Sequence, residues 1–128
     1  MSTRLINGLL SVIFLASGAA KLASLEFEVT AFERWGYPLA FMFLIGTLEV
    51  AGGIGLLLRR WSALAAAALT PLMWGAMGTH LLHQEWPMLG LATAIMALCA
   101  RQAWLARASL VTTLRGGAHG ASAATNPR

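Results

Sequence analysis

Four long apolar runs, separated by short polar stretches, dominate the sequence. They cover residues 5–22, 39–58, 61–82 and 88–104. A helix needs about 20 mostly apolar residues to cross a bilayer. The pattern therefore predicts four transmembrane helices. The fold class that follows is all-α, a membrane four-helix bundle that forms one domain over residues 1–107.

The stretches between and after the runs are polar. Residues 23–38 carry three glutamates and end in a Trp-Gly-Tyr-Pro turn at 35–38. Turn residues beside interfacial aromatics predict a short helix that lies at the membrane surface. Residues 108–128 are rich in Gly, Ala, Ser and Thr and have no periodic apolar face. We expect them to form a disordered cytoplasmic tail.

The first run has a second interpretation as a secretory signal peptide. Arg4 precedes it, and the small residues 18–20 near its end are typical of a cleavage site. The apolar stretch is longer than the usual signal core of about 7–15 residues. We therefore expect the first helix to be retained.

Small residues and one proline shape the predicted helices. Pro71 lies inside the third run, and we expect it to bend that helix. Lipid gives helices no hydrophobic reason to associate, so close contacts at small residues must hold them together. Residues of this kind stand at helical spacing on the second, third and fourth runs: Gly46, Gly52 and Gly53, then Gly75 and Gly78, then Gly90, Ala94 and Ala97.

Composition and charge exclude two classes of protein. The chain is 58% hydrophobic and 11% charged, with a mean hydropathy of +0.68, so a water-soluble domain would lack the polar residues to cover its surface. The net charge of +4 comes from arginines that flank the apolar runs and form no stripe with aromatics, which argues against nucleic-acid binding. By the positive-inside rule, these arginines place both termini in the cytoplasm.

Metal sites and thiol chemistry within the chain are not expected. Cys99 is the only cysteine, so there is no intrachain disulfide or Cys-x-x-Cys pair. His80 and His83 stand at the end of one predicted helix, and no second predicted helix supplies a histidine for a metal or haem. Any redox role must therefore use a bound cofactor or a partner.

One acid, Glu49, interrupts the second run near its centre. An acid there costs on the order of 2.5–3.5 kcal/mol on insertion scales, so it normally faces the bundle interior with a partner. Lys21 and His80, near the ends of the first and third runs, are the candidate partners. Helical side chains lean toward their own N-terminus, so all three lean into one layer in the outer half. We hypothesise a catalytic site of Glu49, Lys21 and His80.

Each of these residues also has a plainer interpretation. Glu49 can be neutral and hydrogen-bonded, holding helices together without chemistry. Lys21 can be an interfacial lysine whose ammonium reaches water, and His80 can be an interfacial or packed histidine. The sequence leaves these alternatives open, together with the protonation state of Glu49 and whether the three side chains touch directly or through water.

Three motifs follow one another along the chain. They are Gly-x-x-Lys at 18–21, the Trp-Gly-Tyr-Pro turn at 35–38, and Gly-x-x-Glu-x-x-Gly-Gly at 46–53. In this order they resemble the DoxX-like family of small bacterial membrane proteins, and the resemblance covers roughly residues 5–104. It implies a four-helix bundle in the bacterial cytoplasmic (inner) membrane. Lys21, Glu49 and His80 match polar positions of the family.

The resemblance also suggests a function. Namesake members are associated with sulfur-compound oxidation coupled to quinone, or with membrane oxidoreductase complexes. We expect no intrinsic cofactor, a quinone as the candidate ligand, and a protein partner that carries a redox cofactor or a second copy of the chain. In the leading hypothesis the protein is a subunit linked to quinone or thiol redox chemistry, in which Lys21 or His80 binds a quinone oxygen or small anion and Glu49 moves protons. The alternatives are a non-catalytic assembly or anchoring subunit and, ranked lower, passage of protons or a small solute.

Overall fold

The structure is a computed structural model that describes residues 2–112 and 115, and five helices of ten or more residues are found there. The helices are α1 (Thr3–Leu22), α2 (Glu26–Trp35), α3 (Leu39–Leu57), α4 (Ser62–Leu82) and α5 (Trp86–Leu105). Each of the four long helices begins and ends within two residues of a predicted apolar run. The all-α class is confirmed, and the described residues contain no strand.

Three of the long helices have the length and hydropathy of a membrane span. They are α1, α3 and α5. Helix α4 is as long, with 21 residues, but it is not among these spans. It continues as one helix on both sides of Pro71. The protein is therefore a helical membrane protein, and the fourth span stays a prediction.

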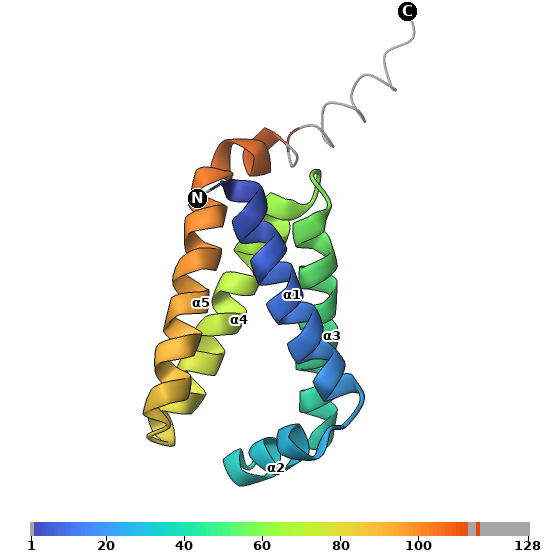
Figure 1. The fold of residues 1–128 in the computed structure, drawn as a ribbon, viewed down its shortest axis with the longest axis vertical. Coiled ribbons are helices and arrows are strands. Elements are labelled where there is room, and N and C mark those ends of the chain that lie inside the picture. Colours follow the sequence, from blue (N-terminus) through green and yellow to red (C-terminus); the bar gives the residue numbers. More distant parts are fainter. Residues whose placement is uncertain (1, 113–114, 116–128) are drawn as a thin grey trace, which may run out of the picture.

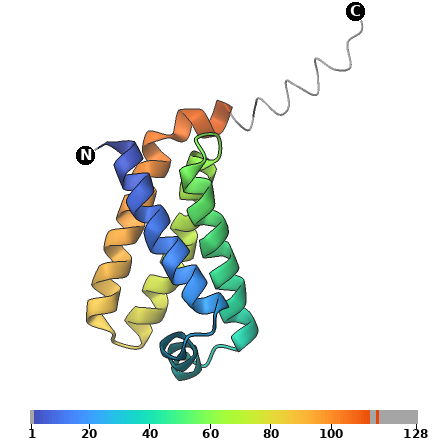
Figure 2. The ribbon, with the colours of Figure 1, turned by 45° about the vertical axis from the view of Figure 1, so that its right-hand side comes forward.

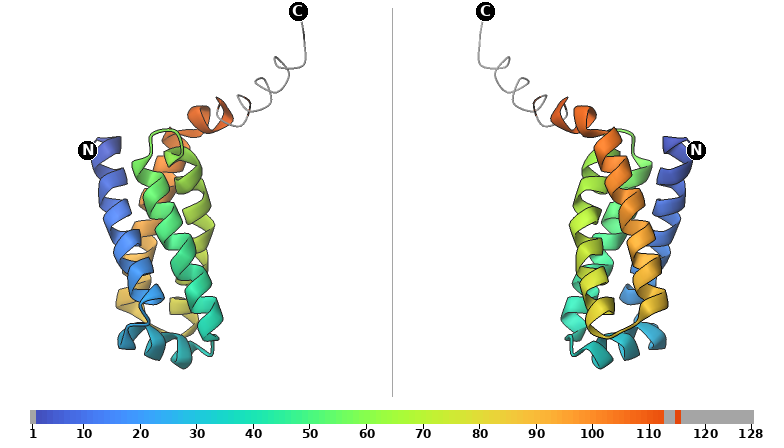
Figure 3. Two further views of the ribbon diagram at one scale, coloured as in Figure 1. Left: turned by 90° about the vertical axis from the view of Figure 1, so that its right-hand side faces the viewer. Right: turned by 90° about the vertical axis from the view of Figure 1, so that its left-hand side faces the viewer.

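The four long helices form two pairs. Helix α1 packs most extensively against α3, and α4 packs most extensively against α5. The pairs lie side by side at one end and diverge toward the other, where α2 lies across the opening (Figures 1 and 2). The start of α1, the end of α5 and the α3–α4 turn lie together at the end opposite α2 (Figure 3).

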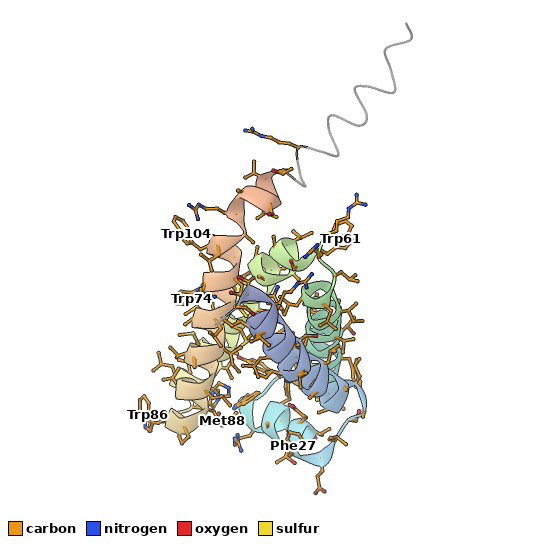
Figure 4. The ribbon with its side chains drawn as sticks, turned by 45° about the horizontal axis from the view of Figure 1, so that its top comes forward. Phe27, Trp61, Trp74, Trp86, Met88 and Trp104 are labelled. Atoms are coloured by element: carbon orange, nitrogen blue, oxygen red, sulfur yellow. The ribbon has the colours of Figure 1, made fainter. Side chains whose placement is uncertain are left out.

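Charge divides the two ends of the bundle. Among the described residues, the charged side chains at the end that holds the start of α1 are all basic, and we call it the arginine end: Arg4, Arg59, Arg60, Arg101 and Arg107. The end that α2 covers carries most of the acids, and we call it the glutamate end: Glu26, Glu28, Glu33 and Glu85. Each end also has exposed aromatic side chains, Trp61 and Trp104 at the first, Phe27 and Trp86 at the second (Figure 4). Exposed tryptophans are typical of the two membrane–water interfaces.

Helices α1 and α3 approach each other at glycines. A Cβ on Gly18 would lie 2.6 Å from the carbonyl oxygen of Gly46, and a Cβ on Gly53 would lie 2.9 Å from Cγ of Leu15. The Ser11 hydroxyl also donates a hydrogen bond of 2.7 Å to the carbonyl oxygen of Gly53. The prediction of close contacts at these glycines of the second apolar run is confirmed.

The same prediction was wrong for Gly75, Gly78 and Gly90, where a Cβ would meet nothing within 4 Å. These glycines do not face a neighbouring helix at close range. The buried positions of α4 and α5 are instead alanines, such as Ala66 and Ala92, together with larger side chains such as Leu69 and Met73.

The connector between α1 and α3 forms α2, as predicted. Helix α2 ends at Gly36, whose φ of +80° is left-handed. Glycine adopts this conformation without a Cβ clash, so it ends the helix and turns the chain toward α3. At the other end of the chain, residues 107–112 are helical. The remainder of the predicted disordered tail, apart from Arg115, lies outside the described residues.

Candidate functional site

A cavity of about 550 Å³ lies between the two helix pairs, and α2 lies over it at the glutamate end. All five helices contribute to its walls, which are mostly apolar and aromatic. Its polar lining includes Ser17, Lys21, Glu28, Glu49, Thr79 and His80. Two groups of contacts organise these side chains.

The first group centres on the ammonium of Lys21. Its Nζ lies 3.1 Å from Oε2 of Glu49 and 3.3 Å from Oε1 of Glu28. It also donates a hydrogen bond of 2.8 Å to the Ser17 hydroxyl. The side chains of Lys21 and Glu49 are only 9% and 10% exposed. One buried lysine therefore lies between two carboxylates, one on α3 and one on α2.

The local sequence explains this placement. Ser17 and Lys21 are four residues apart, so they share one face of α1. Gly46 lies three residues before Glu49 on α3, and a Cβ at Gly46 would lie 2.9 Å from Cβ of Lys21. The missing side chain makes room for the lysine beside the acid. The Gly-x-x-Glu motif therefore serves both the helix contact and the ion pair.

The second group centres on Glu85, the residue before α5. Trp35 Nε1 donates a hydrogen bond of 2.6 Å to Oε1 of Glu85, and Arg34 donates one of 2.8 Å to Oε2. Nδ1 of His80 lies 3.7 Å from Oε1. Glu85 thus ties the end of α2 to the turn between α4 and α5.

These contacts also set the acidity of Glu85. Partial burial by itself would raise the pKa of the carboxyl. The hydrogen bond from Trp35 and the positive charge of Arg34 outweigh that effect and hold the pKa of Glu85 below its ordinary value. Glu85 is therefore ionised at neutral pH and faces His80 as an anion.

Two buried polar atoms at the cavity have no hydrogen-bond partner among the described residues. They are Oε2 of Glu49 and Nδ1 of His80. Each lies near an oppositely charged or chargeable group, at 3.1 Å and 3.7 Å, but without hydrogen-bond geometry. Buried polar atoms are normally hydrogen-bonded, so two that lack a hydrogen bond on one cavity mark where a ligand could bind.

The three predicted site residues all line this cavity, but they do not form one cluster. Lys21 and Glu49 are in direct contact. His80 lies against Glu85 instead, and Nδ1 of His83 lies 2.8 Å from the backbone oxygen of Thr79. The catalytic roles predicted for Lys21, Glu49 and His80 stay predictions.

Sequence reasoning missed Glu28, Glu85 and Trp35 as part of the site. The chain has only five acidic side chains, so each acid in the connectors could have been considered a candidate site residue alongside Glu49. The small number of acids was the feature of the sequence that could have identified Glu28 and Glu85. Their partners depend on where α2 lies, which the apolar pattern does not determine.

The fold and the site are those of a small membrane protein with several spanning helices. It is an apolar helical bundle with a buried lysine–glutamate pair beside a cavity. The chain belongs to the DoxX-like family, whose model matches residues 5–101. It is 30% identical over 93 residues to the "Uncharacterized protein YdgD" of Bacillus subtilis (strain 168), an alignment that covers 70% of this chain and 82% of that protein. No solved structure matches the chain. The predicted family is confirmed.

Proposed function

We propose that the protein is a membrane subunit linked to quinone or thiol redox chemistry and that its cavity binds a quinone headgroup. The observation that carries the proposal is that two buried atoms on one largely apolar cavity, Glu49 Oε2 and His80 Nδ1, have no hydrogen bond from the described residues. A pocket with a few polar groups on apolar walls is the usual form of a small-molecule site.

A quinone headgroup fits the chemistry of this lining. Its flat ring needs apolar and aromatic walls, which Phe32, Trp35 and Phe41 supply. Its carbonyl oxygens need donors, and Lys21 and His80 can each donate a proton or a hydrogen bond. The volume of about 550 Å³ lies within the range of small-molecule pockets, roughly 300–1,000 Å³.

A bound quinone would supply carbonyl oxygens that take up two protons when a partner protein's redox cofactor delivers two electrons. Lys21 would hold one oxygen in place, and the Glu49 carboxylate would take up a proton and pass it to that oxygen. His80 would donate to the second oxygen. Glu28 and Glu85, with side chains 12% and 20% exposed, would connect these inner groups to water at the glutamate end.

The proposed setting is the bacterial cytoplasmic membrane, with four spans and both termini inside. The separation of the arginine end from the glutamate end supports this orientation, because basic residues accumulate on the cytoplasmic side. The cavity would then lie in the outer half of the bundle. The partner that carries the redox cofactor would supply the electrons.

Binding of a short-chain ubiquinone to the detergent-purified protein tests the proposal, with quenching of tryptophan fluorescence as the readout, since Trp35 lines the cavity. We expect Glu49→Gln and His80→Phe each to weaken binding roughly tenfold, the loss expected when one hydrogen bond to a charged group is removed. Glu33→Gln removes an exposed acid of α2 and should change nothing. Absence of binding to the wild type, or wild-type binding and native-membrane activity in Glu49→Gln, would refute the proposal.

A second candidate function is a non-catalytic assembly or anchoring subunit. Polar contacts that fix helix register favour it. Gln102 on α5 donates hydrogen bonds to the carbonyl oxygen of Thr3, at 2.9 Å, and to Oδ1 of Asn7, at 2.7 Å. If this is the role, Glu49→Gln should still co-purify with the partner and support the complex as well as the wild type does.

A further inference from the structure

An apolar groove of about 400 Å³ runs along the outside of the bundle between α3 and α4. Its lining extends along α3 from Leu48 to Leu58, just past the end of that helix, and along α4 from Trp61, just before that helix, to Leu72. Every lining residue is apolar or glycine, and small residues such as Ala51 and Ala68 contribute to it. Except for Leu72, it shares no lining with the cavity of the candidate site.

The groove is about as long as one membrane leaflet is thick. At about 1.5 Å per residue, the part of α3 from Leu48 to Leu58 is roughly 15 Å long. The hydrocarbon core of a bilayer is about 30 Å thick, so each leaflet contributes about half of that. The groove therefore covers the length that one acyl chain occupies in a single leaflet.

Two arginines stand at the end of the groove. Arg59 and Arg60 directly follow Leu58, and Trp61, the next residue, lines the groove. The guanidinium carbon of Arg60 lies 5.4 Å from the centre of the Trp61 ring. Among residues 2–112, neither guanidinium forms a salt bridge with a carboxylate. The end of the apolar groove is thus followed by two arginines that the described residues leave without a carboxylate partner.

We propose that this groove binds an anionic phospholipid, with an acyl chain along α3 and α4 and the phosphate at Arg59 and Arg60. Charge favours a lipid over a second copy of the chain. Copies in one membrane have the same orientation, so a neighbouring copy would bring its own arginine end against these guanidiniums. An anionic headgroup provides the opposite charge at the same depth.

Native mass spectrometry of the detergent-purified protein tests this site with equal amounts of phosphatidylglycerol and phosphatidylcholine that carry the same acyl chains. The wild type should prefer phosphatidylglycerol by roughly 30-fold, the preference expected from two arginine contacts at the membrane surface. Arg59→Gln with Arg60→Gln should abolish the preference. Arg4→Gln removes a charge from the same end but on α1, and it should retain the preference.

A second pair of variants tests the groove itself. Ala51 and Ala68 are exposed in the groove, so Ala51→Leu with Ala68→Leu should fill it without disturbing the helix contact, and adducts of both lipids should fall. Ala16→Leu places the same side chain on an exposed position of α1 outside the groove and should leave the adducts unchanged. Equal binding of the two lipids by the wild type would overturn the proposal, as would an unchanged preference without the arginines. A dimer that the leucine pair dissociates would show instead that a second copy covers the groove.

Discussion

Oε2 of Glu49 lies 3.1 Å from Nζ of Lys21, at a place where α1 and α3 meet through Gly18 and Gly46. The ion pair is almost fully enclosed, so each charge depends on the other to remain inside the protein. Removing one partner of a buried pair is far more costly than replacing both with apolar residues. This asymmetry provides a direct test of the pair.

Lys21→Met should destabilise the protein strongly, by about 3–5 kcal/mol, because it leaves Glu49 buried without its cation. Adding Glu49→Leu to that variant should recover most of the lost stability, since no buried charge remains. Unfolding in a denaturing detergent measures both effects. If the losses of stability measured for Lys21→Met and for Glu49→Leu alone simply add in the double variant, the two residues are not coupled as the structure indicates.

The glycine contacts predict opposite outcomes for one substitution at two positions. Gly53→Leu should cost about 1–3 kcal/mol or more, because even its Cβ would lie 2.9 Å from Cγ and 3.2 Å from the backbone nitrogen of Leu15. Gly78→Leu should have little effect, since a Cβ there meets nothing within 4 Å. The two unfolding midpoints in detergent check this. Equal losses would contradict the close approach at Gly53.

Glu85 should make the fold sensitive to acid. The pKa of its carboxyl is lowered in the folded protein, so its contribution to stability is complete above the ordinary value of 4.5 and is lost as the pH falls through the lower folded value. We expect the Tm of the wild type to fall below pH 4.5. The Glu85→Gln variant should have a lower Tm than the wild type at neutral pH, and its Tm should fall less on acidification. Glu26→Gln removes an acid at an exposed position of α2 and should leave the Tm at neutral pH unchanged.

Reporter fusions test the proposed orientation. A cytoplasm-active reporter fused after Leu105 should be active, and a periplasm-active reporter at the same place should be silent. A reporter inserted in the turn before Glu85 should give the opposite result. Exchanging the basic residues of the α3–α4 turn for glutamine should weaken this orientation. An active periplasmic reporter after Leu105 would reverse the assignment of the two ends.

The long helices could be predicted from the sequence because each apolar run is bounded by polar residues. Lys21 could be named as a candidate partner of Glu49, as His80 was, because few ionisable residues lie within the runs and their side chains lean toward the same layer; whether they touch was left open. The cost of an isolated charge in lipid supplied the reason for pairing them. In these respects local pattern and tertiary structure agree.

Other features depend on how helices are rotated and docked. Gly53 and Gly78 look alike in the sequence, yet only the first faces a neighbouring backbone. Helix α2 has 10 residues, too few for its apolar pattern to specify the direction in which it crosses the bundle. The partners of Glu28 and Glu85 follow from that direction. The sequence pattern alone therefore could not predict that His80 lies beside Glu85 and not beside Glu49.

The pairing of α1 with α3 has a consequence for the order of assembly. Both members of the buried ion pair belong to the first half of the chain, which a ribosome completes before it makes α4 and α5. The first two long helices can therefore enter the membrane as a hairpin whose opposite charges already neutralise each other. The cavity forms only when α4 and α5 pack against this hairpin. The newly made protein can therefore bind a ligand only at the last step of its assembly.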